Sequence, residues 1–258
     1  MHTTEWLRSA DGLPVPAASP ANIHMMSQQP LNLVVLISGT GSNLQALIDA
    51  VPSFQTPAAR ISLVVSNSKF AYGIERAQAA QPPIPTKVHS LAAFRKQNPH
   101  LTDEAEVRSR YDLELAAVIK TGRPHLVVLA GFMHILSEPF LKEMRSDWNS
   151  SNPSTPIPII NLHPALPGQF DGANAIERAW EAGPAGRQEV TETGVMIHEV
   201  IAEVDRGAPI LTRTVELKKD ESLDGLKQRM HDVEHELIVA GTFEMLRRIA
   251  SSPSIQLS

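Results

Sequence analysis

Two polar residues at the end of an apolar run are the first candidates for chemistry. Asn161 and His163 follow Ile159 and Ile160, and Pro164 comes directly after them. Alternate side chains of a strand point to the same face, so the Asn161 amide and the His163 imidazole should lie side by side. An amide can donate to a developing oxyanion, and an imidazole can carry a proton near neutral pH. The pattern predicts a proton-transfer site, with two solvated polar residues at a strand end as the alternative.

A short glycine loop is the second candidate. Gly39 and Gly41 lie between an apolar strand pattern and a helical pattern that opens with Ser42 and Asn43. Glycine lets backbone approach a ligand closely, and the amides of a helix N-terminus favour phosphate. The loop lacks the Lys of a Walker A motif and the third Gly of a dinucleotide fingerprint, so a phosphate monoester is the more natural ligand. An ordinary tight turn capped by Ser42 is the alternative.

A carboxylate near the C-terminal side could complete the site. Asp205 precedes Arg206 and Gly207 in a sequence typical of a hairpin turn. If Asp205 faces His163, its charge favours the imidazolium and raises the His163 pKa, whereas a solvated turn Asp is the alternative. Sequence distance does not say whether the two residues meet.

Other kinds of catalytic site have little support in this sequence. No Gly-x-Ser-x-Gly is present, which speaks against a serine hydrolase of that type. The chain has no Cys, so thiolate zinc sites and a Cys nucleophile are excluded. His231 and His235, four apart in a helical segment, are a weak metal pair, and no metal is predicted.

Composition narrows the possible partners. The 258 residues are 42% hydrophobic and carry a formal net charge of −5, so the chain can bury a core but has no basic footprint for nucleic acid. No apolar run approaches the roughly 20 residues that cross a bilayer. The first residues lack the basic and apolar regions of a secretory signal, so a cytoplasmic enzyme is expected.

Strand and helix patterns alternate along the chain, and they must position these residues. Strands are predicted at 31–37, 61–65, 86–88, 126–130 and 159–163, and helices at 44–51, 74–80, 107–121, 137–146, 173–182 and 222–250. The rest of 81–106 is predicted as mostly loop, and 195–204 and 208–217 as the arms of a hairpin. The pattern predicts an α/β, Rossmann-like fold: an open, mostly parallel twisted sheet with helices on both faces and a C-terminal antiparallel hairpin.

The predicted domain organisation is simple. Residues 1–30 are rich in Pro, Ala and Ser and are expected to be a disordered extension, and 251–258 a C-terminal tail. Residues 31–250 form one domain, in which the proline-rich 146–158 is a surface insertion.

Four motifs together resemble the phosphoribosylglycinamide formyltransferase family. They are the first strand with its glycine loop (33–47), the run 127–136, the Asn-x-His-Pro segment (161–166) and the Asp205 loop (203–210), and the likeness runs from about 32 to 248. The resemblance implies formyl transfer from 10-formyltetrahydrofolate to the amine of glycinamide ribonucleotide, a step of purine (IMP) biosynthesis. It implies small-molecule substrates, no metal, no nucleic acid or membrane partner, and a monomer or homodimer.

The same resemblance assigns roles by position. Asn161, His163 and Asp205 would be catalytic, with Asn161 and Asp205 also touching the folate. The ribonucleotide would be bound by Gly41, Ser42, Asn43, His231, Asp232, Val233 and Glu234. The folate would be bound by Arg108, Met133, His134, Ile135, Leu136, Ile201, Ala202, Glu203 and Val204.

Some features leave alternatives open. The loop 165–174 departs from the usual family pattern, so no polar residue there is assigned, and His134 stands where the family often has Arg. Formyltetrahydrofolate hydrolase and other folate-dependent formyltransferases share the Asn, His and Asp set. The hydrolase carries an extra N-terminal domain and the methionyl-tRNA enzyme an extra C-terminal one, which this chain is too short to hold. A non-catalytic nucleotide-binding module is the alternative outside enzymes.

Overall fold

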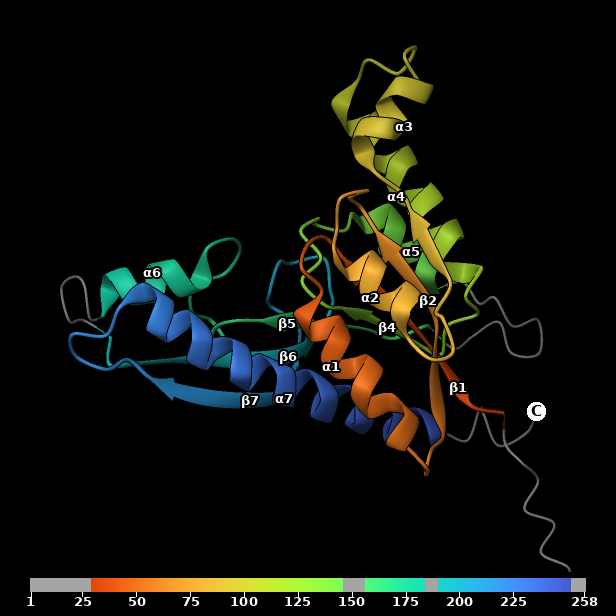
Figure 1. Ribbon diagram of the computed structural model, residues 1–258. Coiled ribbons are helices and arrows are strands. Elements are labelled where there is room, and N and C mark those ends of the chain that lie inside the picture. The colour runs from red at the N-terminus through yellow and green to blue at the C-terminus, as the bar shows by residue number, and fades with distance from the viewer. Residues whose placement is uncertain (1–28, 146–155, 184–189, 252–258) are drawn as a thin grey trace, which may run out of the picture.

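A single seven-stranded sheet organises the chain (Figure 1). The computed structural model describes residues 29–145, 156–183 and 190–251. In chain order the strands are β1 Leu31–Ile37, β2 Ala59–Ser66, β3 Thr86–Val88, β4 Leu126–Leu129, β5 Ile159–His163, β6 Glu192–Glu199 and β7 Pro209–Glu216. Their order across the sheet is β3-β2-β1-β4-β5-β6-β7. The pairs from β3 to β5 are parallel, and those of β6 with β5 and β7 are antiparallel, which confirms the predicted fold.

Helices cover both faces of this sheet. They are α1 Ser42–Ala50, α2 Gly73–Ala79, α3 Leu91–Gln97, α4 Glu104–Lys120, α5 Glu138–Arg145, α6 Ala175–Ala182 and α7 Leu223–Ala250, with the short 3-10 helix η1 Val51–Ser53. In Figure 1, α7 lies along the sheet beside α1, and α4 lies beside α5. No helix among the described residues is long and apolar enough to cross a membrane.

The central strand β1 shows why both faces must be covered. All seven of its residues are buried. Leu33, Val35 and Ile37 join a core cluster with residues of α1 and α7, whereas Val34 and Leu36 join a second cluster with residues of α4 and α5. A strand with apolar side chains on both faces needs a helical layer on each, as parallel sheets usually have.

Three predicted segments differ from the structure. The predicted loop 81–106 was partly wrong, because α3 forms inside it: the Ser90 side chain accepts from the Ala93 amide and caps the helix, which ends before Pro99. The predicted strand 195–204 was too long, because β6 ends at Glu199 and a loop follows. Of the predicted surface insertion, 146–155 lies outside the described residues, and Ile157 is buried in the second core cluster.

The long β6–β7 connection has a local cause. Asp205 has φ +55°, a left-handed conformation that a strand cannot contain. A Cβ on Gly207 would lie 1.6 Å from the Glu199 carbonyl oxygen, so glycine is required there. The Glu199 amide donates to the Ala208 carbonyl and closes a loop over residues 200–207. This loop carries Asp205 back over the sheet.

The carboxyl ends of β1, β4 and β5 meet at one edge. Leu36 pairs with Leu129, and Leu129 pairs with Asn161. From β1 the chain winds outward to β2 and β3, and it then returns to β4 on the other side of β1. Ligands of open α/β sheets bind at such a reversal of strand order, so the fold places the glycine loop and Asn161 at the expected site.

Candidate active site

Neighbouring strands β5 and β6 supply three polar side chains. Asn161 and His163 come from β5, and Asn161 pairs in register with His198 of β6. His163 and His198 are buried, and Asn161 is half-buried. The expected side-by-side placement of Asn161 and His163 follows from the two-residue period of the strand, and β6 adds a second imidazole.

Asp205 reaches all three of these side chains. Its Oδ2 lies 3.3 Å from His163 Nδ1, and its Oδ1 lies 3.3 Å from Asn161 Nδ2 and 3.5 Å from His198 Nε2. The Gly172 amide also donates to Asp205 Oδ2 over 2.8 Å. The predicted meeting of Asp205 with His163 is therefore confirmed, although 42 residues separate them.

The His163 pKa is set by opposing influences. Burial lowers the pKa of His163 below its ordinary value, and the Asp205 charge raises it less than burial lowers it. The nearby His198 lowers the His163 pKa further. The expected direction of the Asp205 effect is right, but the net pKa is lowered. His163 is thus mainly neutral at neutral pH, and its buried Nε2 has no hydrogen-bond partner among the residues that the structure describes.

Asp205 remains ionised beside this neutral ring. Burial acts to raise the Asp205 pKa, but contacts with the His198 ring, the Gly172 amide and His163 lower it more. The carboxylate next to His163 Nδ1 favours the tautomer with its proton on Nδ1. The Nε2 lone pair is then available to accept a proton.

His198 is a site residue that the sequence interpretation missed. Its Nδ1 lies 2.8 Å from the Glu199 carbonyl oxygen and donates to it, and its Nε2 lies 3.1 Å from Asn161 Nδ2 and 3.5 Å from Asp205 Oδ1. The Asn161 amide nitrogen thus contacts His198 and donates, over the longer distance, to Asp205. Only the antiparallel register of β5 and β6, which lies beyond local sequence patterns, brings His198 here.

The glycine loop is held in a fixed shape. Gly41 has φ +70°, and a Cβ there would lie 2.5 Å from the Gly73 Cα at the start of α2. Arg76 donates to the Thr40 carbonyl over 2.9 Å and to Gln45 over 3.2 Å. Gly41, not Ser42, is the N-cap of α1, and no side chain of residues 29–145, 156–183 or 190–251 caps the helix. The N-terminus of α1 keeps its amides free for an anion.

Helix α7 meets the start of α1 through Glu234. Asn43 Nδ2 donates to Glu234 Oε2 over 3.2 Å, and both side chains are buried. Burial raises the Glu234 pKa, and the Asn43 bond offsets part of this effect. Of the other predicted ribonucleotide residues, His231 and Asp232 are exposed and Val233 is half-buried. Within the described ranges, no His, Asp and Glu group is arranged to hold a metal ion.

Exposed apolar side chains mark the predicted folate side. Met133 and Ile135 are 77% and 61% exposed, and Ile201 and Val204 are 37% and 38% exposed. Met133 is fixed near the glycine loop, because its amide donates to Ser38 Oγ over 2.7 Å. Leu136 is buried, whereas Ala202 and Glu203 are exposed.

Arg108 and His134 hold the loop that carries Met133 and Ile135. Arg108 donates to the Ile135 carbonyl over 2.6 Å. His134 Nε2 lies 2.6 Å from the buried Asp112 Oδ1, and Asp112 Oδ2 accepts from the Ser137 amide over 2.9 Å. The His134 side chain thus anchors the loop from inside.

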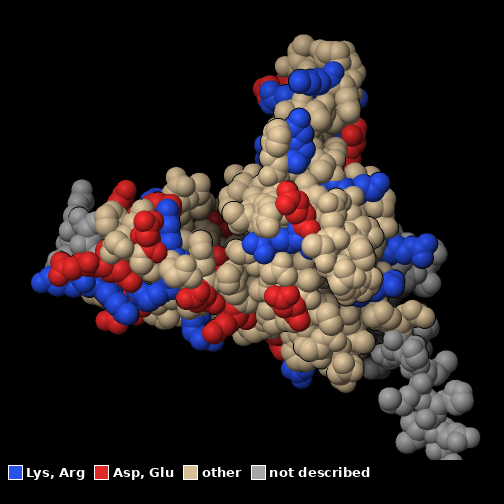
Figure 2. Space-filling model, viewed as in Figure 1, with Lys and Arg blue, Asp and Glu red and all other residues tan. Residues whose placement is uncertain are grey.

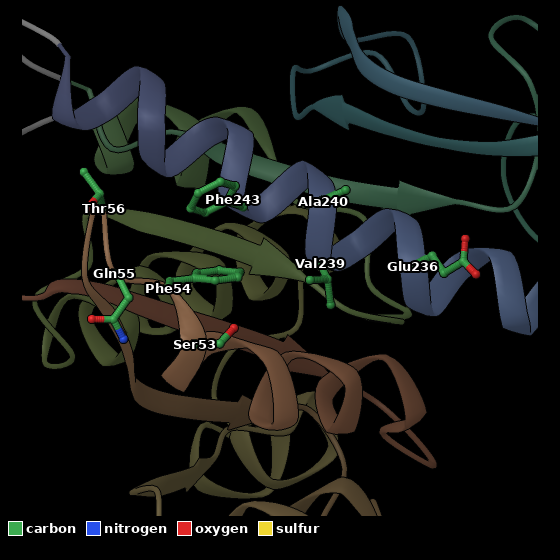
Figure 3. Close-up of a pocket in the computed structure, with 8 residues that line it drawn as sticks. All are labelled: Ser53, Phe54, Gln55, Thr56, Glu236, Val239, Ala240 and Phe243. Carbon is green, nitrogen blue, oxygen red and sulfur yellow. The ribbon is translucent and has the colours of Figure 1, made fainter.

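Other surfaces add little to the site. Figure 2 shows acidic and basic side chains interspersed on the face in view. A groove of about 530 Å³ lies between the loop after η1 and α7 (Figure 3). It is lined by Ser53, Phe54, Gln55, Thr56, Glu236, Val239, Ala240 and Phe243, none of them a predicted site residue.

Known proteins are similar to this chain in sequence. The chain is 44% identical to phosphoribosylglycinamide formyltransferase of Schizosaccharomyces pombe over 217 residues, 83% of this chain and 97% of that protein. It is 40% identical to the trifunctional purine biosynthetic protein adenosine-3 of Drosophila pseudoobscura pseudoobscura, over 82% of this chain and 13% of that protein.

A solved structure gives the same picture. The Coxiella burnetii phosphoribosylglycinamide formyltransferase superposes with a TM-score of 0.66 at 32% identity, covering 85% of this chain and 88% of that one. The family model described as formyl transferase matches residues 31–242, which include every predicted site residue. The chain belongs to the formyl transferase family.

Proposed function

We propose that this site transfers a formyl group from 10-formyltetrahydrofolate to the amine of glycinamide ribonucleotide, in purine biosynthesis. The observation that carries the proposal is the contact of Asp205 with Asn161 and His163, together with a buried His163 Nε2 that has no hydrogen-bond partner within the described ranges. The family and the names of the relatives support the same reaction.

His163 acts first as a base in this proposal. The folate supplies the formyl carbon, and the attacking amine forms a bond to it and becomes positively charged. His163 Nε2 accepts the proton of that amine, and Asp205 stabilises the resulting imidazolium. The same proton then passes to the folate nitrogen as its bond to the formyl carbon breaks. No metal is needed for these steps.

Asn161 stabilises the oxygen of the tetrahedral intermediate. An amide donor aimed at a developing oxyanion lowers the barrier because the charge is absent in the ground state. Asn161 Nδ2 would exchange its longer bond, the 3.3 Å contact with Asp205, for the oxyanion. His198 keeps the amide in place through the shorter bond.

The binding residues follow from the same proposal. The free amides at Gly41, Ser42 and Asn43 would hold the phosphate of the ribonucleotide. Glu234 and the adjacent part of α7 would meet its glycinamide end. The exposed Met133, Ile135, Ile201 and Val204 suit a flat heteroaromatic ring, which supports folate binding between their two loops.

A direct assay tests the proposed reaction. The purified protein is supplied with 10-formyltetrahydrofolate and, separately, with glycinamide ribonucleotide, with initiator methionyl-tRNA or with water alone as acceptor. We expect formylated product with the ribonucleotide only. Equal folate turnover without any acceptor would instead identify a hydrolase, and no turnover in any arm would identify a binding module.

Two further properties belong to this proposal. The protein is expected to work in the cytoplasm as a monomer or homodimer with small-molecule substrates only. The words purine biosynthetic in the name of a relative support the cytoplasmic location. Sedimentation at micromolar concentration measures the oligomeric state.

A further inference from the structure

We propose that Asp171 is a positioning residue: paired with Arg206, it joins the loop after β5 to the loop of Asp205 and so holds the Asp205 carboxylate against His163. This inference rests on the proposed catalytic roles of Asp205 and His163. It assigns a function to the loop 165–174, for which the sequence offered no residue.

Two adjacent contacts connect the loops. Arg206 Nη2 lies 2.5 Å from Asp171 Oδ2, and the next residue along, Gly172, donates its amide to Asp205 Oδ2 over 2.8 Å. The oxygen that accepts from Gly172 is the one that lies 3.3 Å from His163 Nδ1. Consecutive residues of one loop thus bind consecutive residues of the other, and the second contact sets the position of the catalytic carboxylate.

Asp205 needs such support because of its backbone. A non-glycine residue at φ +55° is held in a sparsely populated conformation, which persists only when its surroundings fix it. Phe170 and Asn174 also have positive φ, so the partner loop is itself tightly folded. Arg178 of α6 braces that loop by donating to the carbonyls of Phe170 and Asp171.

Asp171 also contributes charge near the imidazole. The charged and titratable groups that act on His163 are Asp205 and Asp171, which favour the imidazolium, and His198 of β6, which opposes it. The Phe170 backbone also favours the imidazolium, through a hydrogen bond. One Asp171 oxygen pairs with Arg206, and the other, Oδ1, is buried with no hydrogen-bond partner in the described part of the chain. Loss of the Asp171 charge therefore lowers the His163 pKa directly, whereas loss of Arg206 lowers it only by releasing Asp205 from His163.

The test compares Asp171→Asn, Arg206→Gln and the double variant with the intact enzyme. Glu177→Gln is the matched control, because Glu177 also pairs with a cation, Lys227 at 2.8 Å, on a similarly exposed surface. Each single variant should lower kcat about threefold to tenfold, the effect of one partly exposed charged pair. The double variant should lose no more than the worse single variant, because the pair acts as one unit.

A proton NMR titration of His163 adds a readout of the position of Asp205, which a general loss of stability would not change. We expect a lower His163 pKa in both single variants, because both release Asp205 from His163, and no change in Glu177→Gln. The fall should be larger in Asp171→Asn, which also loses the Asp171 charge. Because the Arg206 side chain is exposed, Arg206→Gln should fold and still tests the pair if Asp171→Asn folds poorly. Single variants that match Glu177→Gln, or losses that multiply in the double variant, would overturn the proposal. Asp205→Asn with full activity would instead refute the catalytic assignment itself.

Discussion

At the residue scale, burial and charge act on the His163 pKa in opposite directions. Burial lowers the pKa, and Asp205 restores part of the lost affinity for a proton. A base with a pKa below neutrality is mainly unprotonated at pH 7 and can accept the proton of an attacking amine. The imidazolium that forms is buried beside a carboxylate, so it is stabilised when the reaction needs it.

Replacing Asp205 by Asn tests this balance. The amide keeps the shape but removes the charge, so the His163 pKa falls further below its ordinary value. The active base form then persists to lower pH, and the acidic limb of the rate profile shifts to lower pH while kcat falls. A pH–rate profile and an NMR titration of His163 measure the two effects. An unchanged His163 pKa would mean that Asp205 acts only as a turn residue.

Replacing Asn161 by Ala tests the oxyanion role. One lost oxyanion donor typically costs about 10²–10³ in rate, so kcat should fall by that factor with little change in either KM. Asn98→Ala is the control, since the Asn98 side chain donates to the Phe94 carbonyl of α3 and not to a predicted site residue. Steady-state kinetics with both substrates varied gives the answer, and a loss confined to KM would assign Asn161 to binding.

At the element scale, the turn between β1 and α1 is fixed by its contact with α2. Gly41 combines a left-handed φ with a 2.5 Å approach of its missing Cβ to Gly73. Gly39, two residues earlier, has open space around its missing Cβ. The close approach of α2 and the hydrogen bonds from Arg76 keep the loop in the shape that presents the α1 amides.

Gly41→Ala should therefore act on both stability and binding. A left-handed non-glycine residue costs about 1–3 kcal/mol, and each kcal/mol lowers the Tm of a domain of this size by about 2–4 °C. The displaced loop should raise the ribonucleotide KM far more than the folate KM. Gly39→Ala should leave the Tm unchanged. Calorimetry and kinetics check both, and equal KM increases would count against a phosphate loop.

At the scale of the whole molecule, two core clusters on opposite faces of one sheet account for the fold. β1 has a strand partner on each side, and the Leu31 amide donates to the Ala58 carbonyl at the start of the sheet. The described residues that follow position 28 therefore already supply the sheet, both helical layers and every predicted site residue.

Removing residues 1–28 should leave the protein nearly unaffected. We expect the Tm to stay within about 2 °C, less than the effect of 1 kcal/mol, and kcat and both KM values to stay within twofold. Calorimetry and steady-state assays of the truncated and full-length proteins make the comparison. A large loss of either stability or activity would show that the segment packs on the domain or acts in catalysis.

The sequence alone determined the features that depend on local pattern. Alternation placed Asn161 and His163 on one face of β5, because the strand period is two residues. Runs of apolar residues separated by helical periodicity predicted the parallel sheet, and the boundaries of β1 and β3 were correct. The sequence did not predict the short α3, because the prolines on both sides of it are typical of a loop and its own helical pattern is weak.

Only the tertiary structure decided how distant residues meet. A hairpin pattern at 195–217 could not reveal that β6 ends at Glu199 and that the loop 200–207 turns Asp205 back toward His163, since this loop depends on the close approach of Gly207 to the Glu199 carbonyl. The antiparallel register brought His198 to Asn161, and the Asp112 carboxylate drew His134 into the interior. The sign of the His163 pKa shift was likewise beyond the sequence, because burial, which outweighs the Asp205 charge, exists only in the folded chain.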